Sequence, residues 1–332
     1  MLPLNSATRL FGAAAVLLVF TAFSPWSIGT ADAATPTWIK LNPANSPSAR
    51  YAFAMAYDPV SQKVVLFGGT TPTSYLNDTW TFDGTTWTQV STLVAPPARS
   101  ATMLAYDAPS QKLVLFGGFD GSLLGDTWLW DGATSTWTQA NPTISPAPRS
   151  GVSLFTDPKN QHADVFSGFD GKVWPGDVWQ WNGTDWAQLQ PPVNPEGRAQ
   201  GIVGYDLATR SVVVTGGING GFLRTDNTWT WNGNNWRQQF PATQRPYVFY
   251  TAGAYDPLLQ EVVSYGGDEV NGVVHTTWGW TGTDWVQLQT KNSPPTRDQM
   301  GIAYDPGSRQ LIMFGGLGLK AVLNDTWKLV QR

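Results

Sequence analysis

The chain contains no cysteine, only two histidines and few charges, since charged residues make up 13% of its 332 residues. The absence of cysteine excludes disulfides, thiolate metal sites and cysteine nucleophiles. With His162 and His275 alone, a histidine-built metal centre is not expected, and we expect neither a metal nor another cofactor. The net charge of −4 and the lack of a Lys/Arg cluster argue against nucleic acid or an anionic membrane as a partner.

What the chain has in excess is tryptophan, glycine and proline, with 18, 34 and 24 residues. Aromatic residues at 13% are too frequent for a disordered chain, which has low hydrophobicity and high net charge. Glycine and proline favour tight turns, and aromatic residues favour strands. The composition therefore predicts many short strands joined by tight turns.

Residues 1–33 are predicted to be a signal peptide. Arg9 precedes a mostly apolar run from Leu10 to Phe23, and Ala31-Asp32-Ala33 is the small-x-small pattern of a signal-peptidase site. The apolar run is shorter than the span of about 20 residues that crosses a membrane. We expect cleavage after Ala33, a secreted mature chain and no membrane contact afterwards; the alternative is an uncleaved membrane anchor. An exported chain without cysteine is more typical of a bacterial exoprotein than of a small disulfide-rich one.

The mature chain, residues 34–332, repeats one unit six times. A glycine that follows an apolar segment recurs every 49 or 50 residues, at Gly69, Gly118, Gly168, Gly217, Gly267 and Gly316. One tryptophan series with this period is Trp80, Trp128, Trp179, Trp229, Trp278 and Trp327. A second is Trp38, Trp87, Trp137, Trp186, Trp236 and Trp285. A period of this length indicates a repeat architecture.

Each unit is predicted to contain four short strands. In the second unit these are expected at 99–106, 112–116, 126–131 and 137–139. The segment 112–116 is uniformly apolar, which predicts a strand that is buried on both faces. We expect Gly117-Gly118 to end it, and Asp131-Gly132 is a tight-turn signal.

Six four-stranded units of about 50 residues predict a β-propeller. Pro97 to Trp137 contains the pattern Pro-x-Arg, Tyr-Asp, Phe-Gly-Gly, Asp-Thr-Trp and Trp, which resembles the kelch repeat. The resemblance covers residues 34–332 and implies an all-β, six-bladed kelch propeller, a galactose-oxidase-like fold with four antiparallel strands in each blade. It implies a fold and not a function.

The sixth unit lacks a fourth strand, because its second tryptophan would fall beyond Arg332. The segment Thr37–Leu41 lies one period before Trp87 and is expected to supply this strand from the N-terminus. Closing the last blade in this way removes an open sheet edge, and we expect a monomer.

A binding site is expected on the face that carries the loops between second and third strands and between units, because these loops vary. Aromatic side chains beside a few charges suit stacking on a sugar ring or anchoring of a protein partner. Aromatic candidates on this face include Tyr75, Phe119 and Phe169. The other candidates are Asp120, Asp170, Lys172, Trp174, Phe222, Arg224, Tyr250, Asp268, Glu269 and His275.

An arginine also precedes the first strand in five units, at Arg50, Arg99, Arg149, Arg198 and Arg297. Placed around a channel mouth, these guanidinium groups would bind a carboxylate or a phosphate. Alternatively, each could pair inside its own blade with an aspartate that precedes the third-strand tryptophan. Those aspartates are Asp78, Asp126, Asp177 and Asp325.

The sequence has no phosphate-binding glycine loop, nucleophile elbow or HExxH motif, and we assign no catalytic residue. The function expected is a secreted, non-catalytic scaffold that binds a glycan or a protein. One alternative is an exported carbohydrate-active enzyme resembling the sialic-acid mutarotases, which share the six-bladed kelch fold. Another is a structural module of the cell envelope. Copper-radical chemistry of the galactose-oxidase type is excluded, because it needs a cysteine cross-linked to tyrosine.

Overall fold

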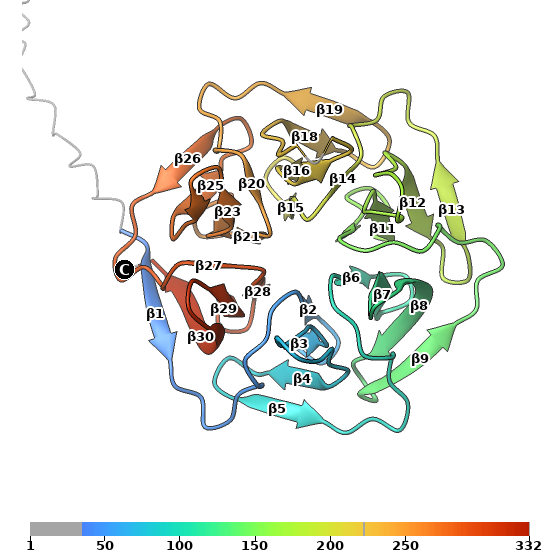
Figure 1. Cartoon of the computed structure of the whole chain (residues 1–332), viewed down its shortest axis with the longest axis horizontal. Coiled ribbons are helices and arrows are strands. Elements are labelled where there is room, and N and C mark those ends of the chain that lie inside the picture. The colour runs from blue at the N-terminus through green and yellow to red at the C-terminus, as the bar shows by residue number, and fades with distance from the viewer. Residues whose placement is uncertain (1–34, 222, 332) are drawn as a thin grey trace, which may run out of the picture. The chain divides into compact units, whose positions relative to one another are not determined.

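The computed structural model describes residues 35–221 and 223–331. The predicted signal peptide 1–33, Phe222 and Arg332 lie outside the described residues. Every regular element in the described part is a β-strand. Most of the strands form six blades of four antiparallel strands around one axis (Figure 1). A fifth, short strand joins the sheet of the last blade, and five further short strands pair separately as a two-stranded and a three-stranded sheet. The all-β propeller expected from the sequence is confirmed.

The strands of each blade follow one another from the axis to the rim (Figure 1). The first blade contains β2 (Ala54–Asp58), β3 (Lys63–Phe67), β4 (Thr79–Phe82) and β5 (Trp87–Val90). The second contains β6 (Met103–Asp107), β7 (Lys112–Phe119), β8 (Leu123–Asp131) and β9 (Thr136–Ala140). The third contains β10 (Ser153–Thr156), β11 (Ala163–Phe166), β12 (Val178–Trp181) and β13 (Trp186–Leu189).

The fourth blade contains β15 (Ile202–Asp206), β16 (Ser211–Thr215), β18 (Thr228–Trp231) and β19 (Trp236–Gln239). The fifth contains β21 (Ala252–Asp256), β22 (Glu261–Tyr265), β25 (Thr277–Trp280) and β26 (Trp285–Leu288). The sixth contains β28 (Gly301–Asp305), β29 (Gln310–Gly318), β30 (Val322–Val330) and β1 (Thr37–Leu41). Short strands beside the last three blades are β14 (Arg198–Ala199), β17 (Ile218–Asn219), β20 (Val248–Phe249), β23 (Asp268–Glu269), β24 (Gly272–Val273) and β27 (Arg297–Asp298).

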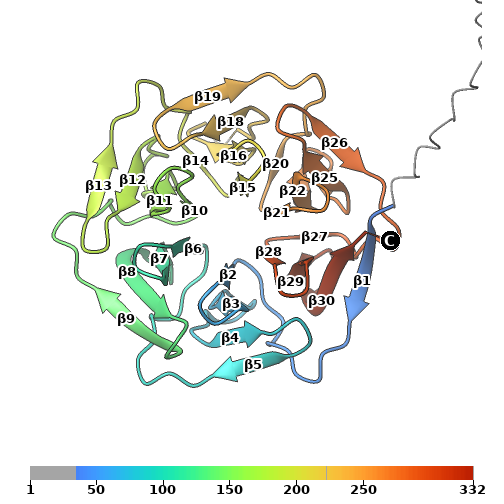
Figure 2. The ribbon, with the colours of Figure 1, turned by 180° about the vertical axis from the view of Figure 1, so that it is seen from behind.

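The N-terminal strand closes the sixth blade, as the sequence predicts. β1 runs antiparallel to β30 with Trp38 opposite Leu329, so the two ends of the propeller domain lie side by side (Figures 1 and 2). Trp38 is fully buried, and its Nε1 donates a hydrogen bond of 3.0 Å to Thr277 Oγ1 in the fifth blade. The strand therefore also ties the last blade to its neighbour.

The same indole contact joins most of the blades. The tryptophan of the fourth strand is buried, and its Nε1 donates to the first threonine of the third strand in the preceding blade. The N···O distances are 3.0 Å for Trp87–Thr326, 2.9 Å for Trp137–Thr79, 2.8 Å for Trp186–Thr127 and 2.9 Å for Trp285–Thr228. In the third blade the threonine position holds Val178, and Trp236 Nε1 is buried without a hydrogen-bond partner in the described structure.

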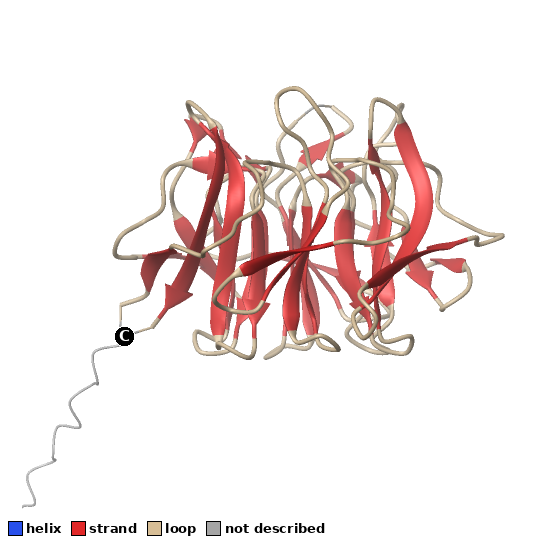
Figure 3. Cartoon of the chain, turned by 90° about the horizontal axis from the view of Figure 1, so that it is seen from below, coloured by secondary structure: helices blue, strands red, loops and turns tan. Residues whose placement is uncertain are grey.

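The two faces of the propeller differ in their connections (Figure 3). The turns between first and second strands, such as residues 59–62, and between third and fourth strands, such as 83–86, are short. We call this side the turn face. The loops between second and third strands, such as 68–78, and between blades, such as 91–102, are longer and form the loop face.

Several strand boundaries of the second unit differ from the sequence prediction, and its third strand begins at Leu123 and not at Asp126. Gly117-Gly118 does not end its strand, because β7 continues through a bulge to Phe119, and β29 does the same to Gly318. A glycine with positive φ allows a bulge without ending the ladder, and Gly117 has φ of 65°. The first strand of the second blade begins at Met103 and not at Arg99, because Ala101, with φ of 52°, turns the chain.

Ala101 belongs to a closed ring of backbone hydrogen bonds around the axis. One residue of each blade lies before the first strand with positive φ, and its N–H donates to the carbonyl of its equivalent in the preceding blade. The N···O distances are 2.9 Å from Ala52 to Gln299, 2.8 Å from Ala101 to Ala52, 2.8 Å from Gly151 to Ala101, 2.9 Å from Gln200 to Gly151, 3.0 Å from Tyr250 to Gln200 and 2.6 Å from Gln299 to Tyr250. We call these six residues the axial ring.

The unpaired indole in the third interface leads to a stability prediction. Val178→Thr should supply the missing acceptor for Trp236 Nε1 at almost unchanged volume and raise the free energy of unfolding by about 1 kcal/mol. Denaturant unfolding followed by tryptophan fluorescence measures this. Val165→Thr, which buries a hydroxyl in the same blade away from that indole, is the control and should destabilise. An unchanged or lower midpoint for Val178→Thr would contradict the prediction.

Candidate functional site

The five predicted arginines lie inside their blades and not around a channel mouth. Four of them are buried and bind the aspartate before the third-strand tryptophan through both terminal nitrogens. The N···O distances are 2.5 and 2.7 Å for Arg50–Asp78, 2.5 and 2.7 Å for Arg99–Asp126, 2.6 and 3.2 Å for Arg149–Asp177, and 2.6 and 2.9 Å for Arg297–Asp325. The structure thus corrects the ligand-facing interpretation of these arginines and supports the architectural alternative.

Each of these ion pairs is completed by neighbouring groups. In the first blade, Arg50 also donates to the carbonyls of Ser48 and Gly68, and Asp78 accepts a bond of 2.7 Å from Trp80 Nε1. The arginine beside it holds the pKa of Asp78 below its usual range despite burial, which acts in the opposite direction. A buried pair with all its hydrogen bonds made is a structural element of the blade.

Arg198 is the exception among the five arginines, because Asn227 stands where the blades of the other four have aspartate. Its Nη1 donates to Asn227 Oδ1 at 2.7 Å, while its Nη2 and Trp229 Nε1 are buried without a partner in the described structure. Burial lowers the pKa of Arg198 to about 10. The fourth blade therefore buries a cation that forms no ion pair with a carboxylate in the described structure, and the nearby Glu196 only partly opposes the lowering of its pKa.

This exception gives a prediction for Asn227→Asp. The new carboxylate should pair with Arg198, accept from Trp229 and raise the free energy of unfolding by about 1–3 kcal/mol. Thermal and denaturant unfolding measure the change. Asn235→Asp, at an exposed position in the turn between β18 and β19 of the same blade, should change stability by less than about 0.5 kcal/mol. A gain no larger than that of the control would show that Arg198 does not need a charged partner.

The loop face over the first three blades is hollowed by a cavity of about 620 Å³. We call this cavity the aromatic cup. Its lining consists of aromatic, small and neutral polar residues: Tyr51, Ala52, Thr70, Tyr75, Ser100, Ala101, Phe119, Gly121, Ser122, Leu123, Ser150, Phe169, Gly171, Gln200 and Gln299. Because members of the axial ring are among them, the ring is its floor.

Isolated β-bridges position the backbone of two aromatic residues of the cup. Phe119 pairs with Ser100 and Phe169 with Ser150, which places each aromatic residue directly after the repeat glycines and beside the chain that enters the blade. Tyr75 lies edge-on to Phe119 with ring centroids 6.1 Å apart. Trp174 packs on Phe169 at 4.6 Å with an interplanar angle of 40°, and extends the aromatic wall toward the fourth blade.

The loop face over the last three blades is charged. Arg224 Nη2 lies 3.3 Å from Asp268 Oδ2, and its guanidinium stands over the ring of Phe249 at 4.8 Å. The pairing of β20 with β23 sets Phe249 opposite Asp268. Burial raises the pKa of Asp298 to about 6, and Asp268 adds to the effect. Burial and these two carboxylates also raise the pKa of Tyr250.

The remaining sequence candidates are dispersed. Asp120 and Asp170 accept backbone N–H groups of their own loops, at 3.0 Å from Ser122 and 2.9 Å from Lys172, so both carboxylates stabilise turns. Lys172 is exposed in the loop before β12, and His275 is exposed in the short connection between β24 and β25.

Glu269 lies in β23 beside the buried Arg245, and its Oε1 is buried without a hydrogen-bond partner in the described part of the chain. Arg245 occupies the place of the repeat arginine in the fifth blade, and burial lowers its pKa to about 9. Phe222 lies outside the described residues. The structure therefore brings Arg224, Tyr250 and Asp268 together and leaves the other charged candidates apart.

The family model described as the KLHDC2/KLHL20/DRC7 Kelch-repeats domain matches residues 28–217, more than half of the chain. This protein belongs to the kelch-repeat family. Kelch repeats generally mediate binding to protein partners. No curated protein matches the chain.

Within residues 35–221 and 223–331 of this kelch propeller, no group of three or more Asp, Glu or His side chains is placed to hold a metal ion. No helix in the same part of the chain is long and apolar enough to cross a membrane.

Sequence reasoning missed four residues of the kelch loop face. Tyr51 and Asp298 directly follow the repeat arginine, and Gln200 and Gln299 follow it by two positions. The residue that follows the repeat arginine differs between most units. Comparing this position across the six units would therefore have singled out Tyr51 and Asp298. The two glutamines have no such signal, since their role depends on the axial ring.

The buried carboxyl of Asp298 predicts a pH effect on stability. A folded-state pKa near 6, above the ordinary value near 4, means that stability is fully present below pH 4 and is lost as pH rises through 6. Asp298→Asn should match the wild type at about pH 4.5 and exceed it at about pH 7.5 by about 1–3 kcal/mol. Melting temperatures across this range measure the difference. An advantage that does not vary with pH would contradict the assignment.

Proposed function

We propose that this kelch propeller is a non-catalytic scaffold that anchors a protein partner in the aromatic cup. The observation that carries the proposal is the lining of the cup: Tyr75, Phe119 and Phe169 form its walls, and no charged residue lines it within the described chain. Aromatic side chains in such a depression are typical binding hot spots. An uncharged apolar segment of the partner would fill the cup without leaving a buried charge unpaired.

The charged side of the loop face supports specificity in the same proposal. Arg224, Asp268 and Asp298 lie beside the cup across the axial ring, where they can contact polar residues that flank the anchoring segment. Rim charges of this kind set orientation and association rate more than affinity. The predicted signal peptide supports export, so the proposed partner is extracytoplasmic.

A glycan is the second candidate ligand. Hydroxyl and amide groups of Ser100, Ser150 and Gln200 line the cup beside the aromatic rings. Sugar rings bind by stacking an apolar face on an aromatic side chain while hydroxyls exchange hydrogen bonds at the edge. This arrangement supports a neutral oligosaccharide over an acidic one.

The test selects ligands against the purified protein from a displayed peptide library and from a neutral glycan array. Ligands that use the cup should bind Tyr75→Ala/Phe169→Ala at least about 30-fold more weakly, which is the loss of about 2 kcal/mol expected when a ligand loses even one of the two rings. Leu258→Ala, on the turn face, is the control and should bind as the wild type does. If only peptides bind through the cup, the result supports a scaffold for a protein partner. If only glycans bind through it, the result supports the glycan as the ligand. Selected ligands that bind both variants equally well would contradict the proposal.

A further inference from the structure

The first strands of the six blades surround a channel of about 760 Å³. It extends from the axial ring to the turn face, where Leu207, Pro257 and Pro306 lie at its mouth. Ala52, Ala101, Gln200 and Gln299 line both this channel and the aromatic cup, so the axial ring is the partition between the two. The volume is within the range of about 300–1,000 Å³ that is usual for small-molecule sites.

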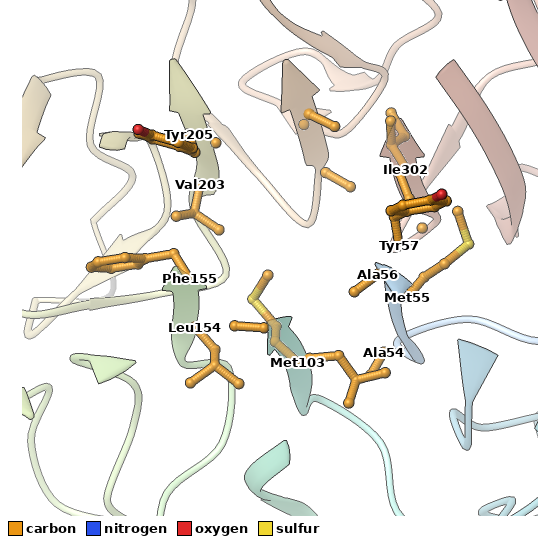
Figure 4. A pocket seen from close by; sticks show the side chains of 18 of the residues that line it. Ala54, Met55, Ala56, Tyr57, Met103, Leu154, Phe155, Val203, Tyr205 and Ile302 are labelled. Atoms are coloured by element: carbon orange, nitrogen blue, oxygen red, sulfur yellow. The ribbon is translucent and has the colours of Figure 1, made fainter. Parts of the chain in front are cut away.

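The wall of the channel is mainly apolar. Figure 4 shows Met103 and Val203 pointing into the space between the first strands. Met55, Met103 and Met300 line it, which are three of the five methionines in the whole chain. Flexible, polarisable thioether side chains adapt to the shape of an apolar ligand and are frequent in binding surfaces that do so.

The threonines of the wall do not offer their hydroxyls to a ligand. Thr102 Oγ1 donates to the carbonyl of Phe116 at 3.0 Å, Thr156 Oγ1 to that of Tyr106 at 2.7 Å, and Thr251 Oγ1 to that of Tyr265 at 2.7 Å. With these hydroxyls bonded to backbone, the side chains leave their methyl groups to the channel. The wall is therefore more apolar than its residue types suggest.

Tyrosines gather where the channel meets the turn face. Five blades contribute the tyrosine of the repeat Tyr-Asp pair, namely Tyr57, Tyr106, Tyr205, Tyr255 and Tyr304. Burial and nearby aspartates raise the pKa of Tyr57 and Tyr106, so their hydroxyls remain neutral donors and acceptors. We call these five residues the tyrosine mouth.

The charges near the tyrosine mouth oppose an anion. The aspartate after each tyrosine or its equivalent is buried, at Asp58, Asp107, Asp157, Asp206, Asp256 and Asp305. Among the described residues that line the channel, the charged one is Arg309, and it is hydrogen-bonded to Tyr304. A ligand group at the mouth thus lies among neutral tyrosines, of which Tyr57 and Tyr205 point their rings outward from the channel (Figure 4), with the buried carboxylates nearby.

The free edges of the first strands limit the shape of an occupant. Each first strand pairs within its blade with the second strand on one side, so its other edge turns backbone N–H and C=O groups toward the axis. A thin chain leaves these groups accessible to water, whereas a wide ring system would strip them of it. The exposed side chain of Leu207, 51% accessible, extends the apolar wall to the entrance.

We propose that the channel is a second binding site, which takes a single alkyl chain with an uncharged hydroxyl head group from the turn face. The chain lies among the methionines and branched aliphatic side chains, and the hydroxyl hydrogen-bonds at the tyrosine mouth. This site is separate from the aromatic cup, and either can exist without the other.

The probe is 1-decanol, titrated into protein carrying carbon-13 in its methionine methyl groups. Saturable shifts are expected for Met55, Met103 and Met300, while Met313, which is fully buried between blades, should not shift and serves as the internal control. Decanoate should bind at least about tenfold more weakly than decanol, because its carboxylate would face the buried aspartates. No saturable shift, a shift of Met313 equal to the others, or equal binding of decanoate would overturn the proposal.

Two variants locate the chain independently. Met103→Lys keeps a similar side-chain length and places an ammonium in the channel, which should weaken decanol binding at least about tenfold. Met55→Lys repeats the test from another blade, and the melting temperature shows that each variant is folded. The cup variant Tyr75→Ala/Phe169→Ala should bind decanol as the wild type does. If both folded lysine variants bind decanol normally, the chain does not lie in this channel.

Discussion

Six backbone hydrogen bonds around the axis determine where the other parts of this propeller lie. Each N–H of the axial ring donates to the blade before it, so all six first strands are held at one level around the channel. A four-stranded sheet with two apolar faces is not stable alone and needs neighbours on both sides. At the rim, the Trp–Thr contacts and the N-terminal strand provide the matching connection. The propeller is thus closed by hydrogen bonds at the axis and by the Trp–Thr contacts and the N-terminal strand at the rim. These contacts take the place of disulfides, which this chain cannot form because it has no cysteine.

The departures from the repeat are concentrated in the third to fifth blades. Val178 leaves the indole of Trp236 without a hydrogen-bond acceptor, and Asn227 leaves Arg198 without a carboxylate partner. In the fifth blade, Arg245 fills the space of the repeat arginine although it lies three residues earlier in its repeat unit than the other arginines do in theirs. Each departure lowers stability by leaving a buried polar group unsatisfied. The charged half of the loop face lies over the fourth to sixth blades. Substitutions that lower the stability of a protein are often retained where they serve a binding surface. The position of these departures is therefore consistent with the loop face as the functional side.

The sequence predicted the propeller, the strand order and the closing strand because tryptophan, glycine and Tyr-Asp repeats encode them directly. It also offered the Arg–Asp pairs as one of two alternatives. The axial ring could not be predicted, because Ala52, Ala101 and Gln200 adopt positive φ without the glycine that usually marks it. The aromatic residues of the cup were predicted as candidates, but their convergence depends on bridges to residues such as Ser100 and Ser150. Asp298 could have been singled out as a departure from the other units, but its burial depends on tertiary packing and could not be predicted.

The axial ring also determines how the two cavities relate to each other. A partition made of backbone stays in place when the side chains around it change, so residues of the cup can vary without altering the channel. Gln200 and Gln299 are the longest side chains that line both cavities, and Tyr250 is hydrogen-bonded to Gln200. Ligands on the two sides would therefore both contact these amides, which makes Gln200 and Gln299 the most direct route for coupling between the two cavities.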